Sequence, residues 1–325
     1  MTPPVDTAAL AARALERDPA SVARAISLVE DRRPEAESQA IALLTELSVR
    51  GRAESCQRVG ITGPPGVGKS TLGSALIRRW RGAGRSVGVL AVDPSSPRSG
   101  GALLGDRARI ELDPDDDGVF VRSMASGGQL GGLARAAGAA VEVLSAVFDV
   151  VLIETVGVGQ SETDIEHVAD TVLLVVQPAS GDVLQFIKAG ILEIPDVLAV
   201  NKSDLGAVAE RALAELTGAL RLCTEPGGLA PPPVVLTSAS GGHGVDQLVL
   251  ALDGHFSALR QSGRLGELRL DKSTAWAARL FAQRHGELGV ERVGGPALLR
   301  TALTRELRQR ATLIEAVRNV AARLA

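Results

Sequence analysis

Residues 61–71 read ITGPPGVGKST, and they decide the fold because they place glycines, a lysine and a serine directly after an apolar segment. The spacing fits G-x-x-x-x-G-K-[ST], with Gly63, Gly68, Lys69 and Ser70 at the fixed positions. Glycines let backbone N–H groups surround an anion, and the following helix directs its positive end at the same anion. We expect the lysine to reach the β- and γ-phosphates of a nucleotide and the serine hydroxyl to bind Mg²⁺. The alternative is a glycine-rich turn with a chance lysine. The predicted nucleotide-binding residues of this loop are Gly63, Gly66, Val67, Gly68, Lys69, Ser70 and Thr71.

Composition and length indicate an ordinary globular protein. The 325 residues can form one large α/β domain with helical additions, or two domains. A net charge of −3 without a basic block does not favour a nucleic-acid partner. Cys56 and Cys223 lie far apart and the four histidines are scattered, so neither a disulfide framework nor a structural zinc site is predicted. The chain shows no leader and no apolar run of about 18 residues, so we expect a cytoplasmic protein without a membrane partner.

Hydrophobic periodicity divides the chain into three regions. Residues 1–53 show helical spacing broken near Pro19 and Pro34, which predicts a helical extension. Residues 54–262 alternate short β-branched runs with helical stretches, which is typical of βαβ units. The predicted fold class is therefore α/β, a mostly parallel, doubly wound sheet with helices on both faces. Residues 263–325 are helical again. Because the motifs follow the strands, one ligand cleft is expected at the carboxyl ends of the sheet.

The last region carries an apolar stripe at spacings of three, four or seven residues. One interpretation is a helix that packs on its own domain, and the other is an arm that packs against a second copy and makes a homodimer. The stripe consists of Leu303, Leu307, Ile314, Val317, Ala321 and Leu324.

The identity of the nucleotide depends on VLAVNKSD, where Asn201, Lys202 and Asp204 follow an apolar strand. A carboxylate beside the base can accept hydrogen bonds from the ring N–H and the amino group of guanine, whereas adenine has no donors at those positions. We expect the lysine stem to lie along the purine, and a backbone N–H at Ser238 or Ala239 to meet the guanine oxygen. The motif predicts GTP and GDP as ligands. A polar turn at a strand end is the alternative interpretation.

Further acidic residues follow two other strands. In FDVVLIETVGVGQSE, Glu154 and Gly157 occupy the places where GTPases commonly carry D-x-x-G, so Glu154 is expected to hold a Mg²⁺ water or to orient the attacking water. Asp93 and Asp106 flank a Ser-, Pro- and Gly-rich stretch that suits a switch loop, or only a surface turn. The predicted catalytic residues are Lys69, Glu154 and Asp106, and the predicted metal ligands are Ser70, Asp93, Asp106 and Glu154.

Together these motifs resemble the MeaB/ArgK family of GTPases, the chaperones of adenosylcobalamin-dependent acyl-CoA mutases. The resemblance rests on GPPGVGKSTL, VLAVDPSSPRSGGALLGDRARI, FDVVLIETVGVGQSE and NKSDL, which lie within residues 20–210. It implies that Asp93, Asp106 and Glu154 serve Mg²⁺ and switching, and that the C-terminal arm dimerises. It also implies control of cobalamin loading and protection of methylmalonyl-CoA mutase or a close relative. Family members often carry an arginine and a histidine in the loop that reads ASGGQLGG here, and the tail beyond Asp271 matches less clearly.

Three other functions compete with this interpretation. A metal-insertion GTPase, such as a nickel-insertion protein, needs His or Cys clusters, which this chain lacks. An ATPase or kinase of cationic amino-acid transport (lysine, arginine, ornithine) conflicts with Asp204. A nucleotide-dependent scaffold with incidental hydrolysis is the third alternative. No built-in arginine finger is obvious, although Arg98, Arg107 and Arg109 are candidates, so we expect slow hydrolysis without a partner.

Overall fold

The computed structural model describes residues 5–31, 33–93, 116–125, 136–155, 164–178, 194–223 and 230–324. Its contacts divide the chain into two compact units, which do not follow one another along the sequence. One unit comprises Met1–Gln57, Arg135–Val151 and Gly263–Ala325, and the other comprises Arg58–Ala134 and Leu152–Ser262. The division into a helical extension 1–53, a GTPase domain 54–262 and a C-terminal helical arm 263–325 stays a prediction.

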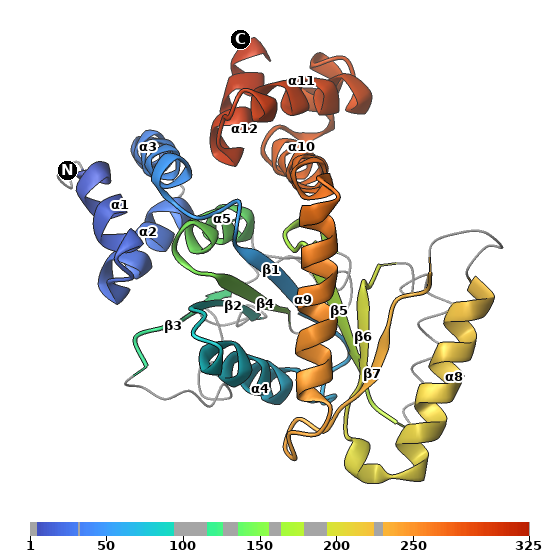
Figure 1. Cartoon of the computed structure of the whole chain (residues 1–325). Helices are drawn as coiled ribbons and strands as arrows, with labels where there is room; N and C mark the ends of the chain where they lie inside the picture. The colour runs from blue at the N-terminus through green and yellow to red at the C-terminus, as the bar shows by residue number, and fades with distance from the viewer. Residues whose placement is uncertain are drawn as a thin grey trace, which may run out of the picture. The chain divides into compact units, whose positions relative to one another are not determined.

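The order of helices and strands within the described residues follows the alternation expected from the sequence (Figure 1). The strands are β1 Gln57–Thr62, β2 Val87–Asp93, β3 Val119–Ala125, β4 Val150–Thr155, β5 Thr171–Val176, β6 Val197–Val200 and β7 Val234–Leu236. The helices are α1 Thr7–Leu15, α2 Pro19–Glu30, α3 Pro34–Arg50, α4 Lys69–Gly82, α5 Ala137–Val147, α8 Ala207–Cys223, α9 Val245–Gln261, α10 Arg264–Arg292, α11 Pro296–Arg308 and α12 Leu313–Ala321. Short 3₁₀ turns lie at η1 Ile165–His167, η3 Ser203–Leu205 and η4 Ala322–Leu324.

The strands form one seven-stranded sheet in the order β3-β2-β4-β1-β5-β6-β7. The pairs β1–β5, β2–β3, β5–β6 and β6–β7 all run parallel. Every residue of β4, β5 and β6 is buried, which explains their continuous apolar sequences, because a parallel strand is covered on both faces. The predicted α/β fold with a parallel sheet is confirmed. This order places β1 between β4 and β5, so the segments that follow these strands meet at one edge.

Helices cover both faces of the β5–β6 region. Side chains alternate between the faces of a strand, and Leu174 and Val176 of β5 pack in one cluster with Leu216 of α8. Thr171 belongs to the opposite set of β5, and its Oγ1 lies 2.9 Å from Nδ1 of His255 on α9. Helix α9 therefore covers the face of the sheet opposite to the one that α8 covers.

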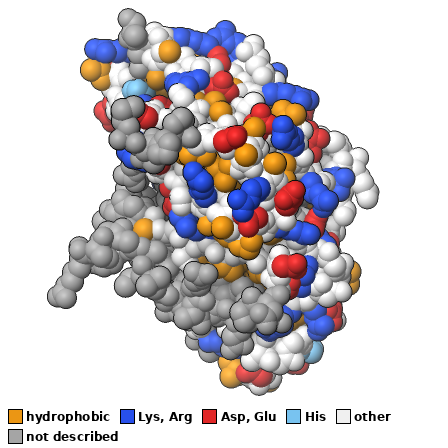
Figure 2. All heavy atoms as spheres, turned by 90° about the vertical axis from the view of Figure 1, so that its left-hand side faces the viewer, with side chains coloured by type: hydrophobic (Ala, Val, Ile, Leu, Met, Phe, Trp, Pro, Cys, Tyr) orange, Lys and Arg blue, Asp and Glu red, His pale blue; other side chains and the backbone are white. Residues whose placement is uncertain are grey.

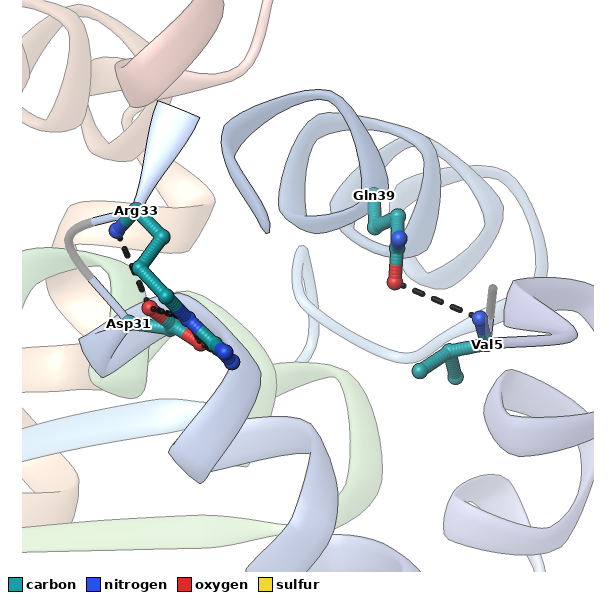
Figure 3. Close-up of polar contacts among 4 residues, drawn as sticks. All are labelled: Val5, Asp31, Arg33 and Gln39. Carbon is teal, nitrogen blue, oxygen red and sulfur yellow. Dashed lines mark hydrogen bonds and ion pairs between the residues drawn. The ribbon is translucent and has the colours of Figure 1, made fainter. Parts of the chain in front are cut away.

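The N-terminal helices begin at the residues that the sequence indicates. Pro19 and Pro34 occupy the first turns of α2 and α3, and Asp18 caps α2 by accepting the N–H of Ser21 at 2.9 Å. Figure 3 shows two neighbouring polar contacts, the Asp31–Arg33 pair between the helices and the N–H of Val5 donated to the Gln39 side chain. The Arg33 guanidinium lowers the pKa of the Asp31 carboxyl to about 2.

The C-terminal stripe lies on two helices rather than one. Helix α11 ends at Arg308, the chain passes through Arg310 at φ +65°, and Thr312 caps α12 by accepting the N–H of Glu315. The buried side chains of both helices pack with α10 of the same chain, which favours the interpretation of a helical region packed on its own unit. This cluster contains Ala277, Phe281, Leu299, Leu303, Ala316, Val317 and Val320. Dimerisation stays a prediction.

The described surface shows no separation of charge on the face seen in Figure 2. Lys and Arg side chains lie among Asp and Glu side chains there. Across the ranges that the structure describes, no helix is both long and apolar enough to cross a membrane.

Candidate functional site

The loop between β1 and α4 has the backbone that its glycines predict. Gly63, Gly66 and Gly68 have φ values of +141°, +79° and +93°, a backbone conformation that residues with a side chain rarely adopt. A Cβ atom at Gly63 would lie 2.1 Å from the carbonyl oxygen of Val175 on β5, so this position requires glycine for space as well. Helix α4 begins at Lys69, which directs its N-terminus, the positive end of the helix dipole, toward this loop.

The lysine of the motif lies against the loop itself. Lys69 is buried, and its Nζ donates to the carbonyl oxygens of Gly63 at 2.7 Å and Pro64 at 2.9 Å. The ammonium is therefore held at the loop, where an anion bound by the backbone N–H groups would meet it.

The carboxyl end of β4 meets the start of α4. The Ser70 hydroxyl donates to Oε1 of Glu154 at 2.7 Å, and Glu154 is only 4% exposed. A hydroxyl that gives its proton to a carboxylate keeps its lone pairs for a cation, and Mg²⁺ prefers oxygen ligands. The residues present therefore fit Mg²⁺. The Asp93 side chain, Asp106 and Gly157 lie outside the described residues, and among those that are described no group of three or more His, Cys, Asp or Glu residues could hold a metal.

A second loop, after β6, is tied to the first. Asn201 is 2% exposed, and its Nδ2 donates to the carbonyl oxygen of Val67 at 2.8 Å. Its Oδ1 accepts the N–H of Ala239 at 3.1 Å and the hydroxyl of Thr237 at 3.3 Å. One buried amide thus joins the phosphate loop to the segments that follow β6 and β7. Asn201 thereby braces the phosphate loop against the loop after β6.

The acidic residue of the second loop has its own partner. Asp204 lies on the exposed turn η3, and its Oδ1 accepts the hydroxyl of Ser238 at 2.9 Å. The same hydroxyl accepts the N–H of Gly241 at 3.2 Å, so both of its hydrogen-bonding functions are used. Ser238 thereby fixes one oxygen of the carboxylate, whereas the sequence interpretation considered only its backbone N–H. The Ala239 N–H, assigned there to the base, donates to Asn201 in this structure.

Lys202 connects three segments. Its backbone has φ +65°, in the left-handed region that non-glycine residues rarely adopt. Its Nζ donates to the carbonyl oxygen of Gly66 at 3.0 Å and also to Oε1 of Gln177, directly after β5. Sequence reasoning did not select Gln177, Thr237 or Pro64, because Pro64 stands at a variable position of the phosphate-loop motif and the motifs above do not include the other two. The sequence feature that could have indicated Gln177 and Thr237 is their position directly after the strands β5 and β7, beside the phosphate loop and the loop after β6.

The structure brings together most of the residues that the sequence selected. Those of the phosphate loop, Glu154, and the residues after β6 and β7 all belong to the unit that contains Arg58–Ala134 and Leu152–Ser262. The candidate finger residues Arg98, Arg107 and Arg109 lie outside the described residues.

Comparison with known proteins identifies the family of the chain. Residues 22–288 match the family described as "Methylmalonyl Co-A mutase-associated GTPase MeaB". A putative GTPase of Pyrococcus horikoshii is 46% identical over 270 residues, which is 82% of each chain. The mitochondrial "Methylmalonic aciduria type A homolog" of Mus musculus is 36% identical over 81% of this chain and 66% of its own.

A solved structure supports the same assignment. The crystal structure described as "LAO/AO transport system kinase" is similar with a TM-score of 0.67 and 25% identity, over 100% of this chain and 99% of its own. The family match covers most of the chain, and the relatives are named as GTPases. The chain therefore belongs to the MeaB family of methylmalonyl-CoA mutase-associated GTPases, and is a GTPase that binds guanine nucleotides.

Proposed function

We propose that this GTPase is a chaperone of an adenosylcobalamin-dependent acyl-CoA mutase, such as methylmalonyl-CoA mutase, and assists its cofactor loading and protection. The family match over residues 22–288 carries the proposal, since the family's description names that mutase. The name of the mouse relative, a methylmalonic aciduria protein, points in the same direction. The client is thus inferred from relatives, and the nucleotide chemistry from the site.

Guanine recognition is assigned to the loop after β6. Asp204 would accept hydrogen bonds from the ring N–H and the amino group of guanine. The Ser238 hydroxyl donates to Oδ1 of this carboxylate and not to Oδ2. Asn201 braces this loop on the carbonyl of Val67. The phosphates would lie on the N–H groups of the loop Gly63–Thr71, with Lys69 beside the β- and γ-phosphates.

Hydrolysis is assigned to the contact between α4 and β4. Ser70 and Glu154 would hold Mg²⁺, directly or through water, with Asp93 and Asp106 as further ligands. Bound there, Mg²⁺ would neutralise charge on the β- and γ-phosphate oxygens. The Ser70–Glu154 bond of 2.7 Å supports this role, because Glu154 can orient the hydroxyl and a nearby water. Lys69 would stabilise the charge that develops on the transferred phosphoryl group.

The partner is tested by steady-state GTP turnover with and without the purified cobalamin-dependent mutase of the same organism. We expect slow turnover alone and acceleration by the mutase, because an added cation near the γ-phosphate is worth about 10³–10⁵ in rate. Lys69→Ala is the control that separates contaminating hydrolysis from that of this chain. Light scattering in the GDP and GTP-analogue states reports the complex. No complex and no acceleration in either state would contradict the proposed client.

The solved relative is described as a transport system kinase, which suggests a second candidate, the kinase of cationic amino-acid transport considered above. A kinase would transfer phosphate from ATP to an acceptor, whereas Asp204 favours guanine. Calorimetric titration with ATP and GTP distinguishes the kinase from the GTPase chaperone. Equal affinities for the two nucleotides would favour the kinase, whereas a preference of tenfold or more for GTP would favour the GTPase chaperone.

The arm 263–325 is proposed to form a homodimer in the cytoplasm. The buried faces of α11 and α12 are used within the chain, so the dimer contact would involve exposed residues of the arm, among them Leu288 of α10 and Leu298 of α11, which are 60% and 56% exposed. Light scattering of the isolated protein measures the mass, and Leu298→Glu should shift it toward the monomer. A monomeric wild-type protein would contradict the proposal.

A further inference from the structure

The geometry points to Gln177 as a positioning residue for guanine-nucleotide binding, acting through Lys202. The inference rests on the proposed nucleotide site. No motif includes Gln177, yet its side chain accepts a hydrogen bond from Lys202. Lys202 belongs to the loop after β6, residues 201–204, here called the guanine loop, and it also contacts the phosphate loop. The amide oxygen is the atom that faces Lys202, because an ammonium group only donates.

The Lys202 ammonium lies between two acceptors from different strands. Gln177 follows β5 and supplies its Oε1, and Gly66 of the phosphate loop, which follows β1, supplies its carbonyl oxygen at 3.0 Å. Strands β1 and β5 are neighbours in the sheet, whereas Lys202 comes from the end of β6, on the far side of β5. The lysine side chain therefore reaches across the end of β5 to the phosphate loop, and Gln177 holds it on the way.

This contact has a consequence for binding, because a lysine side chain loses much rotamer freedom when it is ordered. Gln177 and Gly66 hold the ammonium before the ligand arrives, so the stem is already in place to lie along the purine. The backbone of Lys202 lies in the left-handed region at φ +65°, which fixes the direction in which its side chain leaves the backbone. Removing the Gln177 oxygen leaves the phosphate loop as the remaining acceptor of this pair.

The test uses Gln177→Met, which keeps the length of the side chain and removes the acceptor. We expect Kd for GDP and KM for GTP to rise about tenfold, the effect of one hydrogen bond to a charged group, with kcat within about twofold. The kcat is spared because the proposed effect of Gln177 acts through Lys202, whereas the chemistry is assigned to Lys69 and Glu154. Gln247→Met, a change of an exposed glutamine on α9, is the matched control and should bind GDP as the wild type does.

A double-mutant cycle with Lys202→Met shows whether Gln177 acts through the lysine. In the Lys202→Met background, Gln177→Met should change Kd for GDP by less than about twofold, because the bond is already absent. Gln177→Glu, which retains an acceptor and adds charge, should bind GDP at least as tightly as the wild type. If Gln177→Met does not fold, as judged by circular dichroism, Gln177→Glu still tests the inference, because tenfold weaker GDP binding in that variant would contradict it.

Three results would overturn the inference: wild-type GDP affinity in Gln177→Met, an undiminished effect in the Lys202→Met background, or tenfold weaker binding in a folded Gln177→Glu. A wild-type protein that fails to bind GDP would contradict the proposed site instead. The two failures are therefore distinguishable in one set of titrations.

Discussion

Replacing Gly68 by alanine should destabilise the nucleotide-binding unit through a residue far away in the sequence. A Cβ atom at Gly68 would lie 2.5 Å from Nδ2 of Asn201, and the backbone there has φ +93°. Gly66 offers a matched control in the same loop, since it also has a positive φ of +79° but no atom within 4 Å of the added Cβ. The two substitutions share the backbone strain and differ in the steric contact.

The magnitudes follow from these contacts. Alanine at a positive φ costs about 1–2 kcal/mol, and both variants bear this term. Gly68→Ala must also displace the Asn201 amide and break its 2.8 Å bond to the carbonyl of Val67, which leaves a buried polar group unsatisfied at about 1–3 kcal/mol. We expect a total loss of about 2–5 kcal/mol for Gly68→Ala and about 1–2 kcal/mol for Gly66→Ala.

Denaturant unfolding measures this difference. Of the two tryptophans of the chain, Trp80 lies on α4, which begins directly after Gly68, so its fluorescence in a Trp276→Phe background reports the correct unit. The excess cost of Gly68→Ala should vanish in an Asn201→Ala background, because the displaced amide is then absent. Equal losses for the two glycine variants, or an excess that persists without Asn201, would refute the reasoning.

Three further predictions concern binding, turnover and pH. Asp204→Asn should weaken GTP binding at least tenfold and shift preference toward xanthine nucleotides, because the amide donates where the carboxylate accepted; competition titrations measure this, and unchanged GTP preference would count against the guanine assignment. Lys69→Ala should lose GDP affinity and turnover together, whereas Glu154→Gln should keep GDP binding and lose mainly turnover, so wild-type turnover in Glu154→Gln would remove Glu154 from the chemistry. The Arg81 guanidinium holds the pKa of the Asp116 carboxyl below its usual 3.8, so this pair stabilises the folded protein above pH 3.8 and loses that contribution as the pH falls through the lowered value. Asp116→Asn should therefore have a smaller free energy of unfolding than the wild type at pH 7, and the two proteins should converge in acid. A difference that stays constant across pH would contradict this prediction.

Local sequence was sufficient for the elements and the motifs. The helix expected after the phosphate loop is α4, which begins at Lys69, because the glycines before it supply the backbone of the loop and the apolar spacing after it fits one helical face. Pro19 and Pro34 start their helices because proline fits the first turn, where no N–H is needed. The guanine loop was predicted in the same way, from Asn201, Lys202 and Asp204 after an apolar run. By contrast, the C-terminal stripe was continuous in sequence but not in structure, since periodicity alone does not reveal the left-handed turn at residue 310.

Helical and strand periods, caps and loop glycines act over a few residues, so local sequence is enough to assign the segments and their chemistry. Which segments touch depends on the tertiary fold. The bonds from Asn201 to Val67 and from Ser70 to Glu154 join residues 134 and 84 positions apart, and the support of Lys202 by Gln177 joins two strand ends. These contacts depend on the strand order that places β1 between β4 and β5 and β6 beside β5. That order is set by the packing of all the strands and helices at once, so no single stretch of the sequence contains it.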